Sequence, residues 1–274
     1  MKRLLSSAVR LAAQHGGPVS RELFKLARRY SLIYDNCNDD PRTNGEYWLL
    51  SQLGSFDPRI IFDVGANGGE WSVRCARLFP SAMVHSFEIV PQTAGRLKSR
   101  IIGIPNVAVN HFGLSDFNGE ASVYIRRERD WSSSDGPGVG VVHGVASARI
   151  SGRTVTGDTY VEERGIDQID ILKIDVEGAE DRVLKGFAHA LADRRITVIQ
   201  FEYGHWNIFS HFLLLDFYRL LEPLGFMLGK LYADGVAFKR WDAAAENFHG
   251  PKYVAVHSDR RDVIDAVRSK RAQS

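Results

Sequence analysis

An acid and a glycine-rich loop stand where an apolar run gives way to a helical pattern. Asp63 lies inside the run 60–64, and the loop 65–69 follows directly. Glycine lets a backbone turn tightly and come close to a ligand, and in open α/β folds ligands bind at the carboxyl ends of strands. These residues therefore predict a small-molecule cofactor site. Its expected members are Asp63, Gly65, Ala66, Asn67 and Gly69.

A second acid supports this site. The run 82–87 predicts the next strand and ends before Glu88, which lies about 20 residues past the loop. An acid at that spacing binds a ribose in many nucleotide-binding folds, so the loop and Glu88 together indicate an adenosine-containing cofactor. Because the glycines do not follow the order G-x-G-x-x-G, NAD or FAD is the weaker alternative. A plain strand-to-helix turn is the structural alternative.

A further cluster of acids is expected to serve the chemistry. The run 168–176 is nearly all apolar, which suits a strand buried on both faces; Asp175 ends it, and Glu177 lies in the following turn. The next predicted strand, 196–201, ends at Glu202. Four acids would then line one edge of the sheet, namely Asp63, Glu88, Asp175 and Glu202. The predicted catalytic residues are Asp175, Glu177, Glu202 and His205.

The role of this cluster leaves alternatives open. A carboxylate accepts a proton from a hydroxyl well only when burial raises its pKa, so His111 is a further candidate base beside His205. Carboxylates also suit Mg²⁺, but the spacing matches no dedicated metal loop, and no metal site is predicted. Lys173 is expected to pair with a strand-end acid. Glu180 and Asp181 are expected to stabilise the first turn of a helix.

Strands and helices alternate around these residues. Helical spacing follows the glycine loop, and a third strand is expected at 107–112. Leu114 and Ser115 leave that strand at the sheet edge, where an adenine would lie, so both are predicted to bind the cofactor. The dipeptide Asn118-Gly119 indicates a hairpin before a strand at 121–125.

The rest of the chain completes one α/β domain with a doubly wound, mostly parallel sheet. Helices are expected at 179–191 and 211–221, and an antiparallel pair of strands near 226–238 and 253–257. The predicted parts are a helical N-terminal extension (1–58), the domain (59–258) and a polar C-terminal tail (259–274).

The segment 130–152 is rich in turn residues and too long for an ordinary connection. A lid over the substrate is favoured, because the loop is polar and its lone aromatic residue, Trp131, can cover a bound substrate. An unstructured surface loop is the alternative.

Composition limits the class of protein. With 274 residues, 44% of them hydrophobic and 25% charged, the chain can bury a full core, and a net charge of +2 gives no basis for nucleic-acid binding. Two cysteines indicate neither a disulfide framework nor a zinc site, so the cytoplasm is the expected compartment.

Membrane insertion is not expected either. No apolar run approaches the roughly 20 residues that span a bilayer, and Arg10 interrupts the apolar N-terminal run that a secretory signal requires. An amphipathic N-terminal helix is expected instead, which either docks on the domain or contacts a membrane surface or a partner. The sequence indicates no oligomeric state.

Four blocks of sequence carry a resemblance to one enzyme family. They are residues 62–69, 86–88, 113–116 and 172–180, and they occur in the family's order within the stretch 44–240. On these motifs the chain resembles the FkbM-type S-adenosylmethionine-dependent methyltransferases. It departs from the family in Ile89-Val90-Pro91, where proline usually follows the acid at once, and over 126–153.

The resemblance implies a Rossmann-like methyltransferase fold with S-adenosyl-L-methionine as cofactor. Asp63 and the glycine loop would hold its methionine end, and Glu88 its ribose. The implied reaction is O-methylation of a hydroxyl on a sugar or other secondary metabolite, so the expected partner is a small-molecule or glycan acceptor. A catalytically silent cofactor-binding or scaffold protein of the same fold is the alternative. The acids Asp175 and Glu202 on the acceptor side favour the enzyme.

Overall fold

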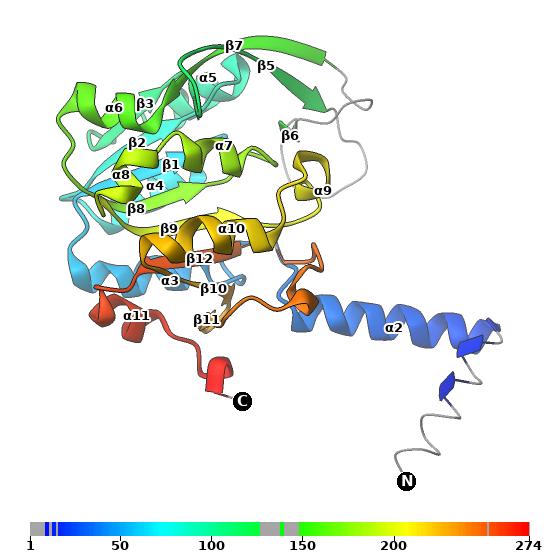
Figure 1. Cartoon of the computed structure of the whole chain (residues 1–274). Helices are drawn as coiled ribbons and strands as arrows, with labels where there is room; N and C mark the ends of the chain where they lie inside the picture. Colours follow the sequence, from blue (N-terminus) through cyan, green and yellow to red (C-terminus); the bar gives the residue numbers. More distant parts are fainter. Residues whose placement is uncertain are drawn as a thin grey trace.

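The computed structural model describes residues 9–10, 13–14, 16–126, 138–139, 148–250 and 252–273. Its centre is an eight-stranded sheet with helices on both faces (Figure 1), in the strand order β11-β10-β12-β9-β8-β1-β2-β3. The strands are β1 (Ile60–Val64), β2 (Met83–Phe87), β3 (Val107–Asn110), β8 (Ile169–Ile174), β9 (Ile196–Glu202), β10 (Phe226–Tyr232), β11 (Gly235–Phe238) and β12 (Lys252–His257).

The sheet is mostly parallel. Strands β1, β2, β3, β8 and β9 pair in parallel, whereas β12 is inserted between β9 and β10 and runs antiparallel to both. The predicted doubly wound sheet and its terminal antiparallel pair are therefore confirmed. Because parallel strands end on the same edge, the residues that follow β1, β2, β8 and β9 come together there.

Two apolar cores join the helices to the two faces of the sheet. Phe62, Leu172 and Phe201 pack with residues of α6, α7, α8 and α10, whereas Ile61 and Ile171 pack on the opposite face with residues of α3, α4 and α11. Successive strand residues point to opposite faces, which explains why β1 and β8 are apolar almost throughout. The α-helices are α2 (Pro18–Tyr34), α3 (Glu46–Leu53), α4 (Glu70–Leu78), α5 (Pro91–Arg100), α6 (Gly157–Arg164), α7 (Glu180–Lys185), α8 (Ala188–Ala192), α9 (Asn207–Ser210), α10 (Leu214–Leu221) and α11 (Arg261–Val267). Short 3-10 turns are η1 (Gly54–Phe56), η2 (Glu222–Leu224), η3 (Ala243–Ala245) and η4 (Lys270–Gln273).

A smaller second sheet corrects the predicted hairpin. It contains β4 (Gly113–Ser115), β7 (Ala148–Thr156), β5 (Gly119–Arg126) and β6 (Gly138–Val139), in that order. The turn at Asn118-Gly119 joins β4 to β5, but β7 lies between them and pairs with both. The prediction of a two-strand hairpin was wrong, because the dipeptide specifies the turn and not the partner of each strand.

Two predicted boundaries also change. The segment expected as a polar tail contains α11, whose Val263, Ile264 and Val267 are fully buried against the face that α3 covers. Helix α3, expected in a separate N-terminal extension, contributes Leu49 and Leu50 to the same core. Helix α11 alternates polar residues with an apolar stripe, so its overall composition hides that it belongs to the domain, whereas α3 is mostly apolar and lies before the first strand.

The single helix expected at 179–191 is two helices, α7 and α8. The break contains Gly186, where a Cβ atom would lie 2.0 Å from the carbonyl oxygen of Ser115. The close approach of this backbone to β4 therefore requires glycine. Most of the predicted lid, including Trp131, lies outside the described residues; of the segment 130–152, the structure describes β6 and the first residues of β7.

Much of the N-terminal run also lies outside the described residues, whereas α2 extends away from the rest of the molecule (Figure 1). Among the described helices, none combines the length and the apolar character needed to cross a bilayer.

Candidate active site

The glycine loop after β1 is held tightly between two neighbouring strands. The amides of Gly65 and Ala66 both donate to the carbonyl oxygen of Phe87, at 3.0 and 2.9 Å. Gly65 has a φ of +80°, and a Cβ atom there would lie 1.9 Å from the carbonyl oxygen of Asp175. Only glycine fits this position, so the loop brings the end of β1 directly against the end of β8.

Glu88 closes the other side of the loop. Its Oε2 accepts a hydrogen bond from the amide of Asn67 at 2.9 Å, and its Oε1 accepts one from the amide of Val90 at 2.8 Å. Burial raises the pKa of Glu88 above its ordinary value. Because a carboxylate oxygen can accept more than one hydrogen bond, the fixed carboxylate keeps lone pairs for ligand hydroxyls. The structure thus brings Glu88 and the predicted cofactor loop together.

Leu114 and Ser115 lie in β4 and are both buried. The hydroxyl of Ser115 donates to Asp116 at 3.1 Å. Gly113, at the start of the strand, packs against Ile89, so that a Cβ atom there would lie 3.1 Å from Ile89 Cδ1. This contact places β4 beside the turn that follows Glu88, on the side where the sequence predicts the adenine.

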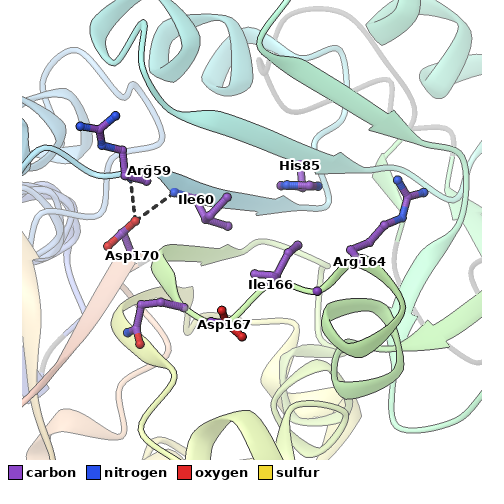
Figure 2. A pocket seen from close by; sticks show the side chains of 9 residues that line it. Arg59, Ile60, His85, Arg164, Ile166, Asp167 and Asp170 are labelled. Carbon is purple, nitrogen blue, oxygen red and sulfur yellow. Dashed lines mark hydrogen bonds between the residues drawn. The ribbon is translucent and has the colours of Figure 1, made fainter.

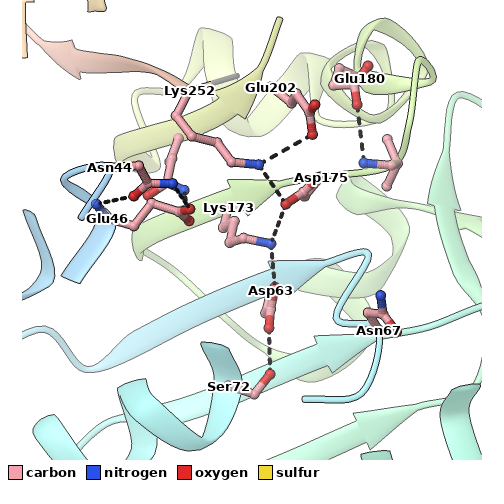
Figure 3. A network of polar contacts seen from close by, with 12 residues as sticks. Asn44, Glu46, Asp63, Asn67, Ser72, Lys173, Asp175, Glu180, Glu202 and Lys252 are labelled. Atoms are coloured by element: carbon pink, nitrogen blue, oxygen red, sulfur yellow. Dashed lines mark hydrogen bonds and ion pairs between the residues drawn. The ribbon is translucent and has the colours of Figure 1, made fainter. Parts of the chain in front are cut away.

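A chain of buried charges runs across the carboxyl ends of β1, β8 and β9 and the amino end of the antiparallel strand β12 (Figure 3). The Nζ atom of Lys173 lies 3.3 Å from Asp63 Oδ1 and 3.1 Å from Asp175 Oδ2. Lys252 Nζ lies 2.9 Å from the same Asp175 oxygen and 3.3 Å from Glu202 Oε2. The predicted pairing of Lys173 with a strand-end acid is confirmed, and it involves two acids.

The two lysines set the charge of Asp175. Burial alone would raise the pKa of Asp175, but Lys173 and Lys252 hold it well below its ordinary value. Burial is the largest cause that raises the pKa of Glu202 well above its ordinary value; Lys252 opposes it and Asp175 adds to it. The two carboxyl groups also hydrogen bond to one another, so of the pair Asp175 is the one that holds its charge more firmly. Adjacent carboxyl groups commonly divide their roles in this way.

Glu177 lies in a strained turn between β8 and α7. Its φ is +54°, which is unfavourable for a residue with a side chain, and Gly178 follows with a φ of +99°. Glu180 Oε1 supports the turn by accepting from the amides of Val176 and Gly178 at 3.1 and 3.2 Å. Burial and the neighbouring Asp175 charge raise the pKa of Glu177 to about 8. Strain of this kind is typical of functional sites.

Glu180 and Asp181 lie in the first turn of α7, as predicted, but Glu180 accepts from amides of the preceding turn, and Asp181 pairs with Lys185 at 2.7 Å. Burial raises the pKa of Glu180 to about 7. The two candidate histidines differ in position. His205 is exposed in the segment after β9, with its ring centroid 4.5 Å from that of Trp206. His111 follows β3, which β2 and β1 separate from β8, so the structure does not bring it to Asp175.

Several polar residues of this network were not predicted. Ser72 on α4 donates to Asp63 Oδ2 at 2.6 Å, and Lys252 bridges Asp175 and Glu202. Glu46 at the start of α3 accepts from Gln200 Nε2 at 2.7 Å and from Asn44 at 2.8 Å. The one sequence signal that could have found any of them is the helical spacing of α4, because Ser72 directly follows Trp71 of its apolar stripe. Within the described part of the chain, no three His, Cys, Asp or Glu residues form a group able to hold a metal ion.

A cavity of about 570 Å³ lies elsewhere, near the amino ends of β1 and β8 (Figure 2). Asp170 accepts there from the amides of Arg59 and Ile60 at 2.7 and 2.9 Å. His85 lines the cavity and hydrogen bonds to Tyr160 at 2.8 Å; burial, with a smaller effect of Arg164, lowers its pKa to about 4. None of the predicted site residues lines this cavity.

Comparison with known proteins shows which family the chain is similar to. Residues 63–228 match the family model of the methyltransferase FkbM domain. The 2-O-methyltransferase NoeI of Sinorhizobium fredii is 26% identical over 175 residues, which cover 56% of this chain and 67% of NoeI. The hexuronic acid methyltransferase AglP of Haloferax volcanii is 30% identical over 147 residues, 53% of this chain and 56% of AglP.

The matched stretch therefore spans between about half and two thirds of these curated relatives. A crystal structure of an FkbM methyltransferase from Methylobacillus flagellatus KT is also similar, with 14% identity and a TM-score of 0.48 over 73% of this chain and 44% of that one.

Proposed function

The chain belongs to the methyltransferase FkbM family, and we propose that it transfers a methyl group from S-adenosylmethionine to a hydroxyl oxygen of a sugar-containing acceptor. The observation that carries the proposal is the arrangement at one sheet edge: Glu88 and the glycine loop stand beside Asp175 and Glu177. The names of NoeI and AglP, which specify 2-O-methylation and a hexuronic acid, support a glycan acceptor.

The residues of the loop fit the cofactor. Glu88 is fixed by two backbone amides and keeps acceptor capacity for the ribose hydroxyls. Asp63 is fully buried and neutralised in part by Lys173, so it supports the loop that would hold the methionine end. When bound, S-adenosylmethionine supplies an electrophilic methyl group on a sulfonium.

The acceptor hydroxyl must lose a proton as its oxygen forms the new bond to carbon and the carbon–sulfur bond breaks. Glu177 suits this task, because a base with a pKa of about 8 binds a proton well, while about a tenth of it is ionised at neutral pH and more at higher pH. Asp175 stays ionised and 24% exposed, and it would orient the hydroxyl by accepting a hydrogen bond. Glu202 Oε2 is already paired with Lys252 at 3.3 Å, so its carboxyl group is less available to the acceptor hydroxyl.

Two measurements test this function. Calorimetry is expected to detect binding of S-adenosylmethionine and of its demethylated product, but not of NADH. Incubation with S-adenosylmethionine that carries an isotopically labelled methyl group is expected to transfer the label to a hydroxyl oxygen of a sugar or uronic acid. NMR of the product would locate the methyl ether. Binding of NADH without binding of S-adenosylmethionine would refute the proposal.

The variant Glu88→Ala is expected to weaken S-adenosylmethionine binding by about 1–3 kcal/mol, because it removes acceptors from a nearly buried position. Glu162→Ala is the control, since Glu162 is exposed on α6, away from the loop. Calorimetry of both variants checks the prediction. Equal affinity of the wild type and Glu88→Ala would remove Glu88 from the cofactor site.

A further inference from the structure

Helix α2 presents an apolar stripe that the described chain leaves uncovered. Its 17 residues include no buried side chain, and it extends away from the rest of the molecule (Figure 1). The stripe consists of Val19, Leu23, Leu26, Tyr30 and Ile33, each between 55% and 74% exposed. These residues recur at spacings of four and three, so they share one face of the helix.

The opposite side of α2 is strongly basic. Arg21, Lys25 and Arg28 are exposed there, beside the exposed Phe24, and Arg29 lies at the edge of the stripe. Glu22 is the one acid of the helix. Lys25 pairs with Glu22 at 2.7 Å, but both side chains are about 70% exposed, so the pair holds them only weakly. The first 34 residues of the sequence contain seven lysines and arginines against this single acid.

The positive charge of α2 indicates what kind of surface covers its apolar stripe. Two copies of α2 packed together would each bring four cations and one anion, so repulsion would oppose their pairing. An anionic lipid surface, in contrast, attracts the cations while its acyl boundary covers apolar and aromatic side chains. We propose that α2 lies in the plane of an anionic membrane surface with the stripe inserted and Arg21, Lys25, Arg28 and Arg29 near the headgroups.

A membrane contact of α2 would also hold the α/β domain near the membrane surface, because the end of α2 is attached to the domain. At the end of α2, Asn36 Nδ2 donates to the carbonyl oxygens of Asn44 and Leu231, at 2.8 and 3.0 Å. The helix end is therefore joined to β10 and to the residue two positions before Glu46 of the site network. This inference is independent of the proposed reaction, because it rests on α2 alone.

Co-sedimentation of the full chain with vesicles tests the proposal. We expect at least about tenfold stronger partition to vesicles of phosphatidylcholine and phosphatidylglycerol than to phosphatidylcholine alone, because each cation near an anionic surface strengthens binding about fivefold. High salt is expected to reduce this difference. Equal partition to both kinds of vesicle would overturn the proposal.

Matched variants assign the contact to α2. Leu23→Glu with Leu26→Glu, and separately Arg28→Glu with Arg29→Glu, are each expected to lower partition at least about tenfold. Ile102→Glu is the control, because Ile102 is 81% exposed at the end of α5 and should not affect partition. Cofactor binding should be equal in all four proteins, which would show that they are folded. Unchanged partition in either double variant would overturn the proposal. So would a dimer in sedimentation velocity that only the Leu23/Leu26 variant loses, since a second copy would then cover the stripe.

Discussion

Replacing Lys173 by methionine is expected to lower the free energy of unfolding by about 3–5 kcal/mol, because it leaves buried carboxylates without their cation. Lys173 is 5% exposed and contacts two acids, of which Asp63 is fully buried. Burial alone would lower the pKa of Lys173, but Asp175 and Asp63 raise it above its ordinary value, so Lys173 is charged in the native state. Urea unfolding followed by circular dichroism measures the loss.

Two further variants test whether the loss of stability comes from the unpaired buried charge. Lys185→Met is the control, because Lys185 is half exposed and its pair with Asp181 is worth about 0.5 kcal/mol or less. Adding Asp63→Asn to Lys173→Met should recover about 1–3 kcal/mol, since the unpaired charge is then removed as well. If Lys173→Met lost no more stability than Lys185→Met, the buried network would not depend on its cations.

The parallel part of the fold could be predicted because β1, β8 and β9 are apolar nearly throughout and an acid lies at or near the end of each of β1, β2, β8 and β9. Asp63, Glu88, Asp175 and Glu202 were expected at one edge, and the parallel pairing of β1, β2, β8 and β9 places them there. Residue periodicity does not specify which strands are neighbours, and for that reason the partner of β5 was missed. A short apolar stripe in a polar segment, as in α11, is similarly hard to assign to a core.

The same limit explains why Lys252 was overlooked. It lies 50 residues after Glu202 and 77 after Asp175, and it meets them only because β12 is inserted antiparallel between β9 and β10. A lysine at the start of a strand is unremarkable in a sequence. Its presence changes the chemistry that the acids can perform, because Asp175 was one of the expected candidate bases and two cations hold its pKa well below the ordinary value, so it binds a proton poorly. Glu177, expected beside it, has the pKa that the task requires.

Glu177→Gln is expected to lower kcat for methyl transfer about 10²–10⁴-fold, because the amide cannot accept the proton of the acceptor hydroxyl. The wild-type rate should rise with pH up to the Glu177 pKa of about 8 and level off above it, since only the ionised carboxylate is active. The variant should lack this rise. Initial rates across the pH range, with calorimetry to confirm that cofactor affinity stays within a few-fold, measure both effects.

Asp175→Asn provides the matched comparison. The Asp175 charge raises the pKa of Glu177, so its removal should move the rise in rate to lower pH, even if the maximal rate also falls. A rate that still increases toward pH 8 in Glu177→Gln would contradict the assignment and transfer the role of base to His205 or Glu202. His205→Gln would then distinguish these two, because it removes the titrating imidazole and leaves the hydrogen bond between Glu202 and Asp175 in place.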